Sequence, residues 1–494
     1  RDPEMSRGLG DVYKRQELIP KNRRLNLTKR KGYPQMKRII AALIAVSLIL
    51  SMTACNGGDT SGNIDSGNAS TSADGTSSGN TDNEQKLRSN PIAVDENGKI
   101  DMDVALKYET DVDALIKKLE AKTPDGSKPV SENTNEETLE LFNYLKSVYG
   151  KQILAGQQYS DANQFENIMY YNTTGDMPAI MGFDFLYAQG TDEPDYTQIE
   201  EAIKWHNEQN GIVSFCWHWK VPVDIDDDSV KGTAFYSKDI RNFSLENAVT
   251  PGTKEYNVVI EDIDTIALYL QRLETAGVPV IWRPLHEASG NWFWWGMKDK
   301  ETYKKQLYQK LWYMVYDRLE NYHKLTNLIW VWNGQSKLTT VNANTYDISG
   351  IDIYPTSENH SEQKAKYKEL SKCTDTSKMT ALSEVGYIPD PEAVFAESSE
   401  VKWLYYMPWC KEFVCAASGS GAIITKLGGT PSVNTERMSE EFLKGVFSSD
   451  KVITLSELPD FKGTTKKMPE FINNWKFNNP NLTIENDKLT AYQQ

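Results

Sequence analysis

The sequence predicts a protein of the α/β class, a (β/α)8 TIM barrel, and three observations lead to this prediction. The chain has 494 residues, of which 39% are hydrophobic and 25% charged, which is ordinary for a globular protein and long enough for one barrel with additional segments. Eight short apolar or β-branched runs recur with helical segments between them, an order that implies parallel strands joined by crossover helices. No G-x-G-x-x-G motif follows an early strand, so an open dinucleotide-binding sheet is not supported.

The N-terminal part of the chain carries processing signals rather than a fold. Met36, Lys37 and Arg38 precede an apolar run from residue 39 to 50, and small residues lead directly to Cys55. The pattern is typical of a secretory signal and is similar to the lipobox of bacterial lipoproteins, so we expect a lipidated Cys55 and a protein held at the extracellular face of the cell, or secreted. As a helix, the uncharged stretch would reach only ~24 Å, short of the ~30 Å hydrocarbon core, so a membrane-spanning helix is the weaker alternative.

A flexible tether follows the cysteine. Residues 56–83 are almost entirely Gly, Ser, Thr, Asn and Asp, a composition that cannot bury a core. The predicted organisation begins with an upstream or cloning-derived segment (1–35), a signal peptide (36–54) and the lipidated cysteine with its linker (55–90). An N-terminal extension (91–134), the barrel (135–460) and a polar tail that could begin a further module (461–494) follow.

The folded elements are predicted in chain order. A polar helix is expected over residues 136–148, and the strands that follow contain apolar residues at consecutive positions, as expected when both faces are covered. Apolar residues from Val259 to Leu273 recur at helical spacing before Gly277, which predicts an amphipathic helix, and a second one is expected over residues 301–321. The eight expected strands cover residues 153–159, 179–185, 211–219, 278–286, 327–333, 350–355, 379–386 and 403–409.

Charge and composition restrict the possible ligands. The formal net charge of −15 opposes binding to a phosphate backbone or to an anionic lipid surface, so no nucleic-acid partner is expected and membrane attachment would come only through the lipid anchor. The 13 Trp, 25 Tyr and 15 Phe residues are many for such a chain and offer flat surfaces on which sugar rings can stack.

Cysteine and histidine usage argues against a metal centre. The chain has five His and no C-x-x-C pair, so we expect neither a transition metal nor another cofactor. Cys216, Cys373, Cys410 and Cys415 remain in the mature part, where one disulfide is possible but the pairing cannot be deduced from spacing. The acidic run from Asp224 to Asp228 lacks the EF-hand pattern and is interpreted as a solvated loop rather than a calcium site.

Two glutamates end facing strands of the predicted barrel. The fourth strand ends Arg-Pro-Leu-His-Glu at Glu287, and the seventh ends Leu-Ser-Glu-Val-Gly around Glu384. In this fold the active site lies where strands end, and strands four and seven face each other across the mouth. Two converging carboxyls are what glycoside hydrolysis needs, one to protonate the leaving oxygen and one to attack or to activate water. The alternative is that each glutamate only pairs with a basic residue at the rim.

Other polar and aromatic residues end neighbouring strands. Arg283 and His286 could orient and tune the carboxyls. Asp352 and Tyr354 lie near the end of the sixth strand, and their side chains are expected in different layers unless the strand already stops at these residues. Tyr354 could donate to the nucleophile. His218 is a second histidine at a strand end. Trp292 and Trp409 are candidate flat surfaces on which pyranose rings could stack, although some tryptophans of the chain are expected in the core.

These residues resemble glycoside hydrolase family 26, the β-mannanases among the enzymes with catalytic glutamates on strands four and seven. The resemblance covers about residues 135–460 and rests on Arg-Pro-Leu-His-Glu with a Trp five residues later, Leu-Ser-Glu-Val-Gly, Asp-Ile-Tyr-Pro and Trp-His-Trp. It implies that Glu287 is the acid/base and Glu384 the nucleophile of a retaining mechanism. It also implies that His286 tunes the acid, that Tyr354 contacts the nucleophile, and that three residues line the sugar site: His218, Trp292 and Trp409. The family's usual Met-Asn-Gly after the acid/base is Ala-Ser-Gly here, a departure near the leaving-group side.

The resemblance predicts a monomeric endo-β-1,4-mannanase acting on mannan, galactomannan or glucomannan. Two alternatives stay open: a β-1,3-1,4-glucanase or β-1,3-xylanase on the same scaffold, because subsite contacts select the sugar, and a surface glycan-binding lipoprotein without catalysis. The sequence does not decide between endo and exo action, nor what residues 461–494 do.

Overall fold

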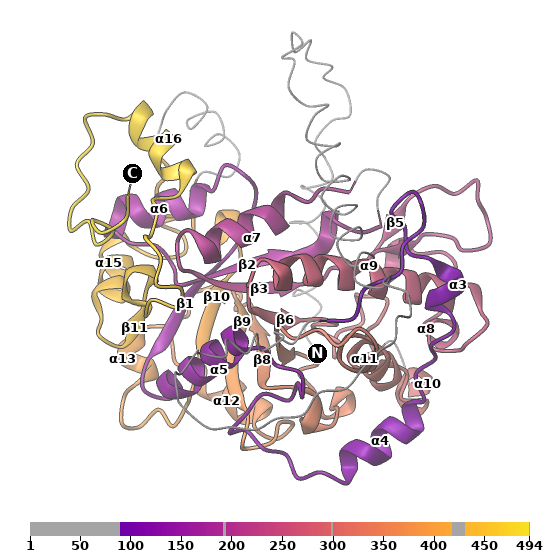
Figure 1. The fold of residues 1–494 in the computed structure, drawn as a ribbon. Coiled ribbons are helices and arrows are strands. Elements are labelled where there is room, and N and C mark those ends of the chain that lie inside the picture. Colours follow the sequence, from indigo (N-terminus) through magenta and orange to yellow (C-terminus); the bar gives the residue numbers. More distant parts are fainter. Residues whose placement is uncertain (1–88, 191–193, 298–299, 417–429, 494) are drawn as a thin grey trace, which may run out of the picture. The chain divides into compact units, whose positions relative to one another are not determined.

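Eight parallel strands form a closed barrel in the structure, which is a computed structural model and describes residues 89–190, 194–297, 300–416 and 430–493. Neighbouring strands pair in the order β10, β9, β8, β7, β6, β3, β2, β1, and β1 pairs again with β10, which closes the sheet. Figure 1 shows these strands surrounded by helices. The predicted fold is therefore confirmed, and the strands are β1 (Ile153–Gln158), β2 (Ile180–Asp184), β3 (Ile212–Cys216), β6 (Val280–Arg283), β7 (Leu328–Trp332), β8 (Ile348–Ile353), β9 (Met379–Val385) and β10 (Tyr405–Pro408).

The two longest helices of the described residues occur where the sequence predicts them. α5 (Glu136–Val148) has the predicted bounds, and the side chain of Asn135 caps its first turn. α9 (Lys254–Thr275) begins after Thr253, whose side chain accepts the N–H of Tyr256, and its apolar face from Val259 to Leu273 is buried. The left-handed Gly277 (φ 69°) follows its end, in agreement with the predicted stop.

The helix predicted over residues 301–321 is divided into three pieces. These are α10 (Lys300–Lys304), α11 (Leu307–Asp317) and a π-helical turn, η3 (Arg318–Tyr322). The break lies at Gln306, whose left-handed backbone (φ 52°) cannot continue an α-helix. Helical spacing alone does not reveal such a break, because the apolar face continues across it.

Helices do not separate every pair of strands, contrary to the expected regular alternation. Between β7 and β8 the chain forms only the 3-10 turns η4 (Lys337–Thr339) and η5 (Ala343–Thr345). The N-terminal helix α5 contacts β7, and α4 (Val112–Glu120) contacts α11, so the N-terminal extension helps to cover this side of the barrel. The other main helices are α3 (Met102–Ala105), α6 (Phe165–Thr174), α7 (Thr197–Asn207), α8 (Leu245–Ala248), α12 (Lys364–Leu370), α13 (Pro391–Val394) and α15 (Glu440–Ser448).

Large aromatic side chains fill the interior. Trp282, Trp330 and Trp332 lie on strands and have no exposed surface. Trp217 stacks on Trp219 with ring centroids 3.9 Å apart. Burial of such side chains removes large apolar areas from water, so most tryptophans of this chain stabilise the core rather than bind a ligand.

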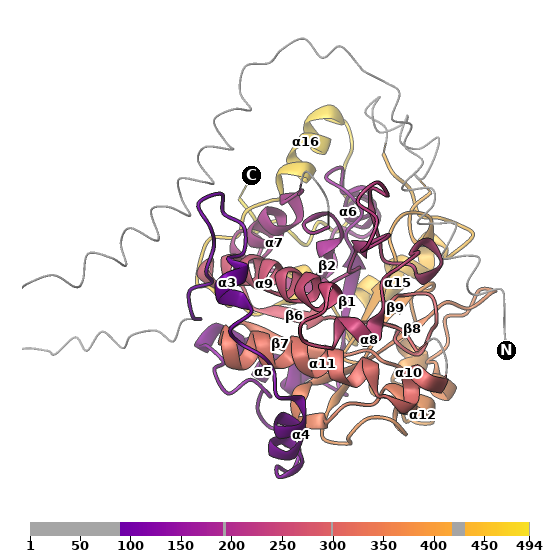
Figure 2. The same cartoon turned by 90° about the vertical axis from the view of Figure 1, so that its right-hand side faces the viewer.

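The C-terminal residues pack on the barrel helices. A short strand, β11 (Val452–Ile453), pairs with β1, and α16 (Glu470–Asn478) lies beside α6, as Figures 1 and 2 both show. Tyr171 donates to Asp487 (2.7 Å), and Gly175, which ends α6, approaches the tail so closely that a Cβ there would overlap the carbonyl oxygen of Asn486. Residues 461–493 thus share buried contacts with the barrel unit.

The processing signals and the tether predicted for residues 1–88, including Cys55, lie outside the described residues. Within the described part of the chain no helix has the length and apolar character needed to cross a membrane. The four cysteines of this part are free thiols, so the disulfide that the sequence left open is not formed. Burial raises the pKa of Cys216 and Cys410, which keeps both as neutral thiols.

Candidate active site

The structure brings the two predicted glutamates together at the mouth of the barrel. Glu384 lies near the end of β9, and Glu287 follows β6. One carboxylate oxygen from each of Glu287, Asp352 and Glu384 lies within 4.8 Å of the other two. Glu287 is 6% exposed and Glu384 2%, so the pair is shielded from bulk water. The alternative that the sequence left open was a basic partner at the rim for each glutamate. Glu384 does pair with a basic residue, Arg283, but both members of that pair are buried.

Glu384 is surrounded by donors. Arg283 Nη2 forms a buried ion pair with its Oε1, and the hydroxyl of Tyr354 donates to its Oε2 at 2.6 Å. Burial and the neighbouring Glu384 raise the pKa of Tyr354 well above its usual range, so the phenol keeps its proton and remains a donor. Glu384 thus has a cation on one carboxylate oxygen and a hydroxyl donor on the other.

Glu287 has a different environment. Trp292 Nε1 donates to its Oε2 (2.8 Å), and no cation pairs with it among the described residues. Burial raises the pKa of Glu287 well above its usual range, and repulsion from Asp352 and Glu384 raises it further, which favours the protonated form of this carboxyl. Two carboxyls in such different surroundings are the arrangement expected of an acid and a nucleophile.

A strained loop places Glu287 at this position. Leu285 and Glu287 both have left-handed backbones (φ 52° and 53°), a conformation that is rare outside Gly and Asn. Asn333 at the end of β7 holds the loop, because its backbone oxygen (2.9 Å) and its side-chain oxygen (3.1 Å) both accept the N–H of Glu287. The strain at a cleft carboxyl is consistent with a functional role.

Arg283 joins Glu384 to a third carboxyl. Its Nη1 lies 3.1 Å from Asp352 Oδ2, while Asp352 Oδ1 accepts from Ser383 (2.7 Å) and from the Asn333 amide (3.1 Å). Burial raises the pKa of Asp352 to about 7 although Arg283 opposes the shift. The three carboxyls have a geometry that a cation could bind, and the guanidinium of Arg283 already supplies that positive charge.

Asp352 and Tyr354 both contact the site, because β8 ends at Ile353, the one case in which the sequence does not place them in different layers. Asp352 pairs with Arg283, and the hydroxyl of Tyr354 donates to Glu384. The pairing with β9 shifts register here: Ile351 is opposite Leu382, but Asp352 is opposite Glu384. This bulge directs Ser383 and Glu384 toward Asp352 and Tyr354.

The two predicted histidines touch. His286 Nε2 lies 3.3 Å from His218 Nε2, and His218 Nδ1 lies 2.5 Å from Asp184 at the end of β2. Burial lowers the pKa of His286 well below its usual range, and His218 and Arg283 lower it further, so His286 is neutral. Trp295 Nε1 donates to the backbone oxygen of His286 and fixes its position.

The predicted aromatic platforms line the same site. Trp292 is partly exposed beside Glu287, and Trp409, which follows β10, has its ring centroid 6.1 Å from that of His218. Gly290 permits this arrangement, because a Cβ there would overlap the ring of Trp292. Glycine is therefore required in the Ala-Ser-Gly segment that follows Glu287.

Sequence reasoning missed three polar residues of the site. Asp184, Asn333 and Ser383 are all buried, and each contacts a predicted site residue. Their positions at strand ends could have indicated them, because polar side chains at the ends of barrel strands face the mouth.

The acidic run from Asp224 to Asp228, for which the sequence predicts a solvated loop, makes contacts at the surface. Asp226 pairs with Lys254 (2.6 Å), and Asp227 accepts from Ser229, both at exposed positions. These contacts are typical of a solvated loop.

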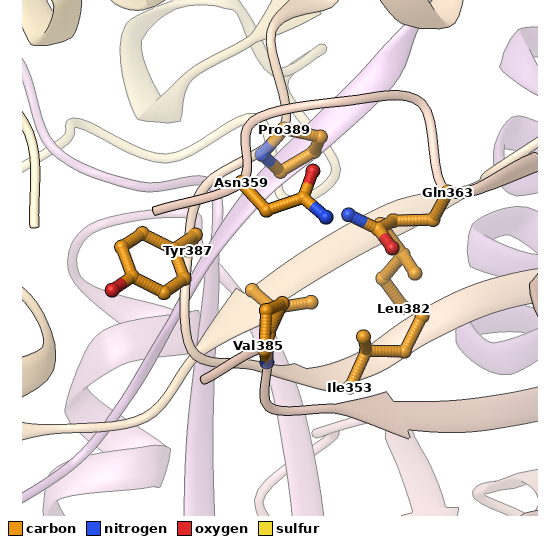
Figure 3. A pocket seen from close by; sticks show the side chains of 8 residues that line it. Ile353, Asn359, Gln363, Leu382, Val385, Tyr387 and Pro389 are labelled. Atoms are coloured by element: carbon orange, nitrogen blue, oxygen red, sulfur yellow. The ribbon is translucent and has the colours of Figure 1, made fainter. Parts of the chain in front are cut away.

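A small hollow lies on the other side of β8 and β9. Ile353 and Val385, which neighbour Asp352 and Glu384 in sequence, line it, and Figure 3 shows the amides of Asn359 and Gln363 facing each other above them. Successive strand residues point to opposite faces, so this hollow and the carboxyl cluster are separated by the sheet.

Comparison with known proteins identifies the family. Residues 130–420 match the sequence profile of glycosyl hydrolase family 26, which is more than half of the chain. The chain belongs to glycosyl hydrolase family 26. The mannan endo-1,4-beta-mannosidase A of Piromyces sp is 35% identical over 358 residues, 68% of this chain and 53% of that protein. The mannan endo-1,4-beta-mannosidase of Thermothelomyces thermophilus is 37% identical over 324 residues, 64% of this chain and 60% of its own length. The match thus covers only 53% and 60% of the lengths of these two relatives.

Solved family 26 structures share the fold. A ruminal GH26 endo-beta-1,4-mannanase is 29% identical with a TM-score of 0.58, over 68% of this chain and 72% of that one. The beta-mannanase from a symbiotic protist of the termite Reticulitermes speratus, solved with a gluco-manno-oligosaccharide, is 30% identical with a TM-score of 0.56, over 69% of this chain and 99% of that one. The barrel is therefore the architecture that these family 26 structures share.

Proposed function

We propose that this family 26 protein is an endo-β-1,4-mannanase that cleaves mannan, galactomannan or glucomannan with retention of configuration. The observation that carries the proposal is the position of Glu287 and Glu384, with one oxygen of each within 4.8 Å of the other. Retaining glycosidases hold their two carboxyl groups ~5–5.5 Å apart, whereas inverting enzymes need ~6.5–9.5 Å to admit a water. The mannanase activity of the relatives supports the choice of substrate.

In the first step, Glu384 attacks the anomeric carbon of the sugar. The glycosidic C–O bond breaks, its electron pair stays on the leaving oxygen, and that oxygen takes the proton of Glu287. The products are a glycosyl ester on Glu384, a free chain end and an ionised Glu287. Arg283 and Tyr354 hold Glu384 as an ionised, oriented nucleophile before the attack.

In the second step, Glu287 takes a proton from water, whose oxygen attacks the same carbon. The ester bond breaks, and its electron pair returns to Glu384 as a carboxylate. The charge of Glu384 is one cause of the raised pKa of Glu287, so esterification removes this repulsion and lowers that pKa. The proton of Glu287 is thus retained until the attack begins, and its release is favoured once the ester has formed.

The aromatic residues bind the sugar around the scissile bond in this proposal. Trp292 donates to Glu287 and presents its partly exposed face beside it, and Trp409 stands near His218. Flat apolar faces pack on the C–H faces of pyranose rings, while His218 and Arg283 supply polar contacts.

Chemical rescue tests the assignment. Glu384→Ala should hydrolyse an activated aryl mannoside at a small fraction of the wild-type rate, and azide should restore turnover because it occupies the space of the missing carboxylate and attacks the same carbon. Glu362→Ala, a glutamate outside the cluster, is the control and should keep wild-type activity. Wild-type activity of Glu384→Ala would refute the proposal. Reducing ends released from galactomannan, glucomannan, lichenan and xylan identify the sugar, and lichenan or xylan as the best substrate would reject the mannanase assignment.

We also infer that the mature protein is a monomeric lipoprotein attached to the outer face of the cell through Cys55, after cleavage of residues 36–54. The apolar run, the small residues before Cys55 and the tether after it support this inference. In a bacterial host, labelling with an alkynyl fatty acid should tag the wild type and not Cys55→Ser. Equal labelling of the two proteins would contradict the inference.

A further inference from the structure

Asp184 makes an unusually complete set of contacts to His218. Its Oδ1 accepts the backbone N–H groups of His218 and of Leu186, each at 3.0 Å, and its Oδ2 receives His218 Nδ1 at 2.5 Å. Asp184 and His218 are 8% and 1% exposed. Burial would raise the pKa of Asp184, but the interaction with His218 and the hydrogen bonds that the carboxyl accepts outweigh burial and lower this pKa, so the carboxyl is ionised. The Nδ1 atom of His218 therefore carries a proton.

The other nitrogen of His218 meets a second imidazole. His218 Nε2 and His286 Nε2 are 3.3 Å apart, a distance at which two bare lone pairs repel, so one proton lies between them. His286 stays neutral because burial lowers its pKa, and its second nitrogen, Nδ1, is buried without a hydrogen-bond partner among the described residues. The protonation of His218 thus decides whether His286 Nδ1 is a donor or an acceptor, one residue before Glu287.

We propose that Asp184 is a positioning residue of the active site, which fixes His218 with a proton on Nδ1 and, through the contact of the two imidazoles, sets the tautomer of His286. The kinetic part of this inference rests on the proposed function.

The substitution Asp184→Asn separates position from charge. The amide oxygen remains on the two backbone N–H groups, because both are donors and only an acceptor satisfies them. The NH2 group then faces His218 Nδ1, which must offer a lone pair and move its proton to Nε2. That N–H points at His286 Nε2, so the tautomers of both histidines are reversed while the fold keeps its hydrogen bonds.

NMR of the protein labelled with 15N-histidine gives a readout independent of activity, and only five histidines have to be assigned. In the wild type, long-range 1H–15N correlations should show His218 protonated at Nδ1, and in Asp184→Asn the proton should be on Nε2. A bare Nδ1 in the wild type, or an unchanged tautomer in a folded Asp184→Asn, would overturn the proposal. Should the wild type fail to cleave any glycan, the proposed function falls, and these spectra still decide the role of Asp184.

Kinetics then test whether Asp184 acts through His218. For Asp184→Asn we expect kcat/KM on mannan oligosaccharides to fall roughly 10- to 100-fold, the effect of one lost charged hydrogen bond. In a His218→Gln background the same change should have little further effect, because the two substitutions act on one contact. Equal losses in the two backgrounds would refute the mechanism. Asp176→Asn is the matched control: Asp176 is also buried and accepts from Thr454 (2.7 Å) and Ser456 (2.5 Å) away from the site, and its substitution should leave kcat/KM unchanged.

Discussion

The buried carboxyl of Glu320 makes the stability of the fold depend on pH. Glu320 lies in the π-helical turn η3 and is 3% exposed, with Trp330 Nε1 donating to one oxygen (2.6 Å) and Ser131 to the other (2.7 Å). Burial raises its pKa from 4.5 to about 7, against the opposing effect of these two hydrogen bonds, and Asp347 adds a small further rise. The substitution Glu320→Gln removes the ionisation and leaves the shape nearly unchanged.

The sign and size of the effect follow from the shift. The folded protein keeps the proton of Glu320 up to about pH 7, whereas the unfolded chain loses it near 4.5. The folded state therefore binds more protons between these values, and its stability falls as the pH rises through this window and stays lower above it. The difference in pKa corresponds to about 3 kcal/mol, at ~1.4 kcal/mol per pH unit. In Glu320→Gln the side-chain amide would accept from Trp330 and donate to the Ser131 hydroxyl, so both partners stay satisfied.

Urea denaturation followed by tryptophan fluorescence measures this difference. We expect Glu320→Gln and wild type to have similar free energies of unfolding near pH 5, and the variant to be more stable by up to about 3 kcal/mol near pH 8. Glu261→Gln, at an exposed position of α9, is the control and should change neither value. If Glu320→Gln were less stable than wild type by the same amount at both pH values, the carboxyl would be ionised throughout and the reasoning refuted.

Three further substitutions probe the active site. Tyr354→Phe removes one of the donors to Glu384. We expect kcat/KM to fall roughly 10- to 100-fold with little change in the thermal midpoint of unfolding. Unchanged kinetics would show that the 2.6 Å contact is dispensable. Trp292→Phe removes the N–H that lowers the pKa of Glu287, so the alkaline limb of the kcat/KM profile should move to higher pH, and a shift to lower pH would contradict the protonated state of Glu287. Arg283→Met leaves the carboxyls of Asp352 and Glu384 buried without their cation. Urea denaturation should then show a free energy of unfolding lower by about 3–5 kcal/mol. An unchanged free energy of unfolding would mean that the ion pairs do not stabilise the fold.

The barrel could be predicted because its strands are buried on both faces. Runs such as those of β3 and β7 are apolar at nearly every position, and this local signal does not depend on what each strand pairs with. The carboxyls could be predicted for a related reason. The ends of parallel barrel strands meet at one mouth, so Glu287 and Glu384 converge without knowledge of any contact.

The parts that could not be predicted depend on tertiary contacts. The break at Gln306 leaves the apolar spacing of α10 and α11 intact, and the lack of a helix between β7 and β8 is compensated by α5, which comes from the start of the barrel. The register shift that brings Ser383 and Glu384 to Asp352 has no local sequence signal. Asp184 and Asn333 belong to strand ends by sequence, and only the closed barrel gives them His218 and Glu287 as partners.

The position of Arg283 supports the proposed choice of Glu384 as the nucleophile. Its guanidinium bridges Asp352 and Glu384, whereas Glu287 has Trp292 as its side-chain donor and two like charges nearby. With the roles exchanged, the nucleophile would lack the cation and the acid would be paired with the buried guanidinium, so neither carboxyl would have the partner that its role needs. The retaining mechanism then needs no rearrangement of the site, because the charge lost on Glu384 in the first step is what readies Glu287 for the second.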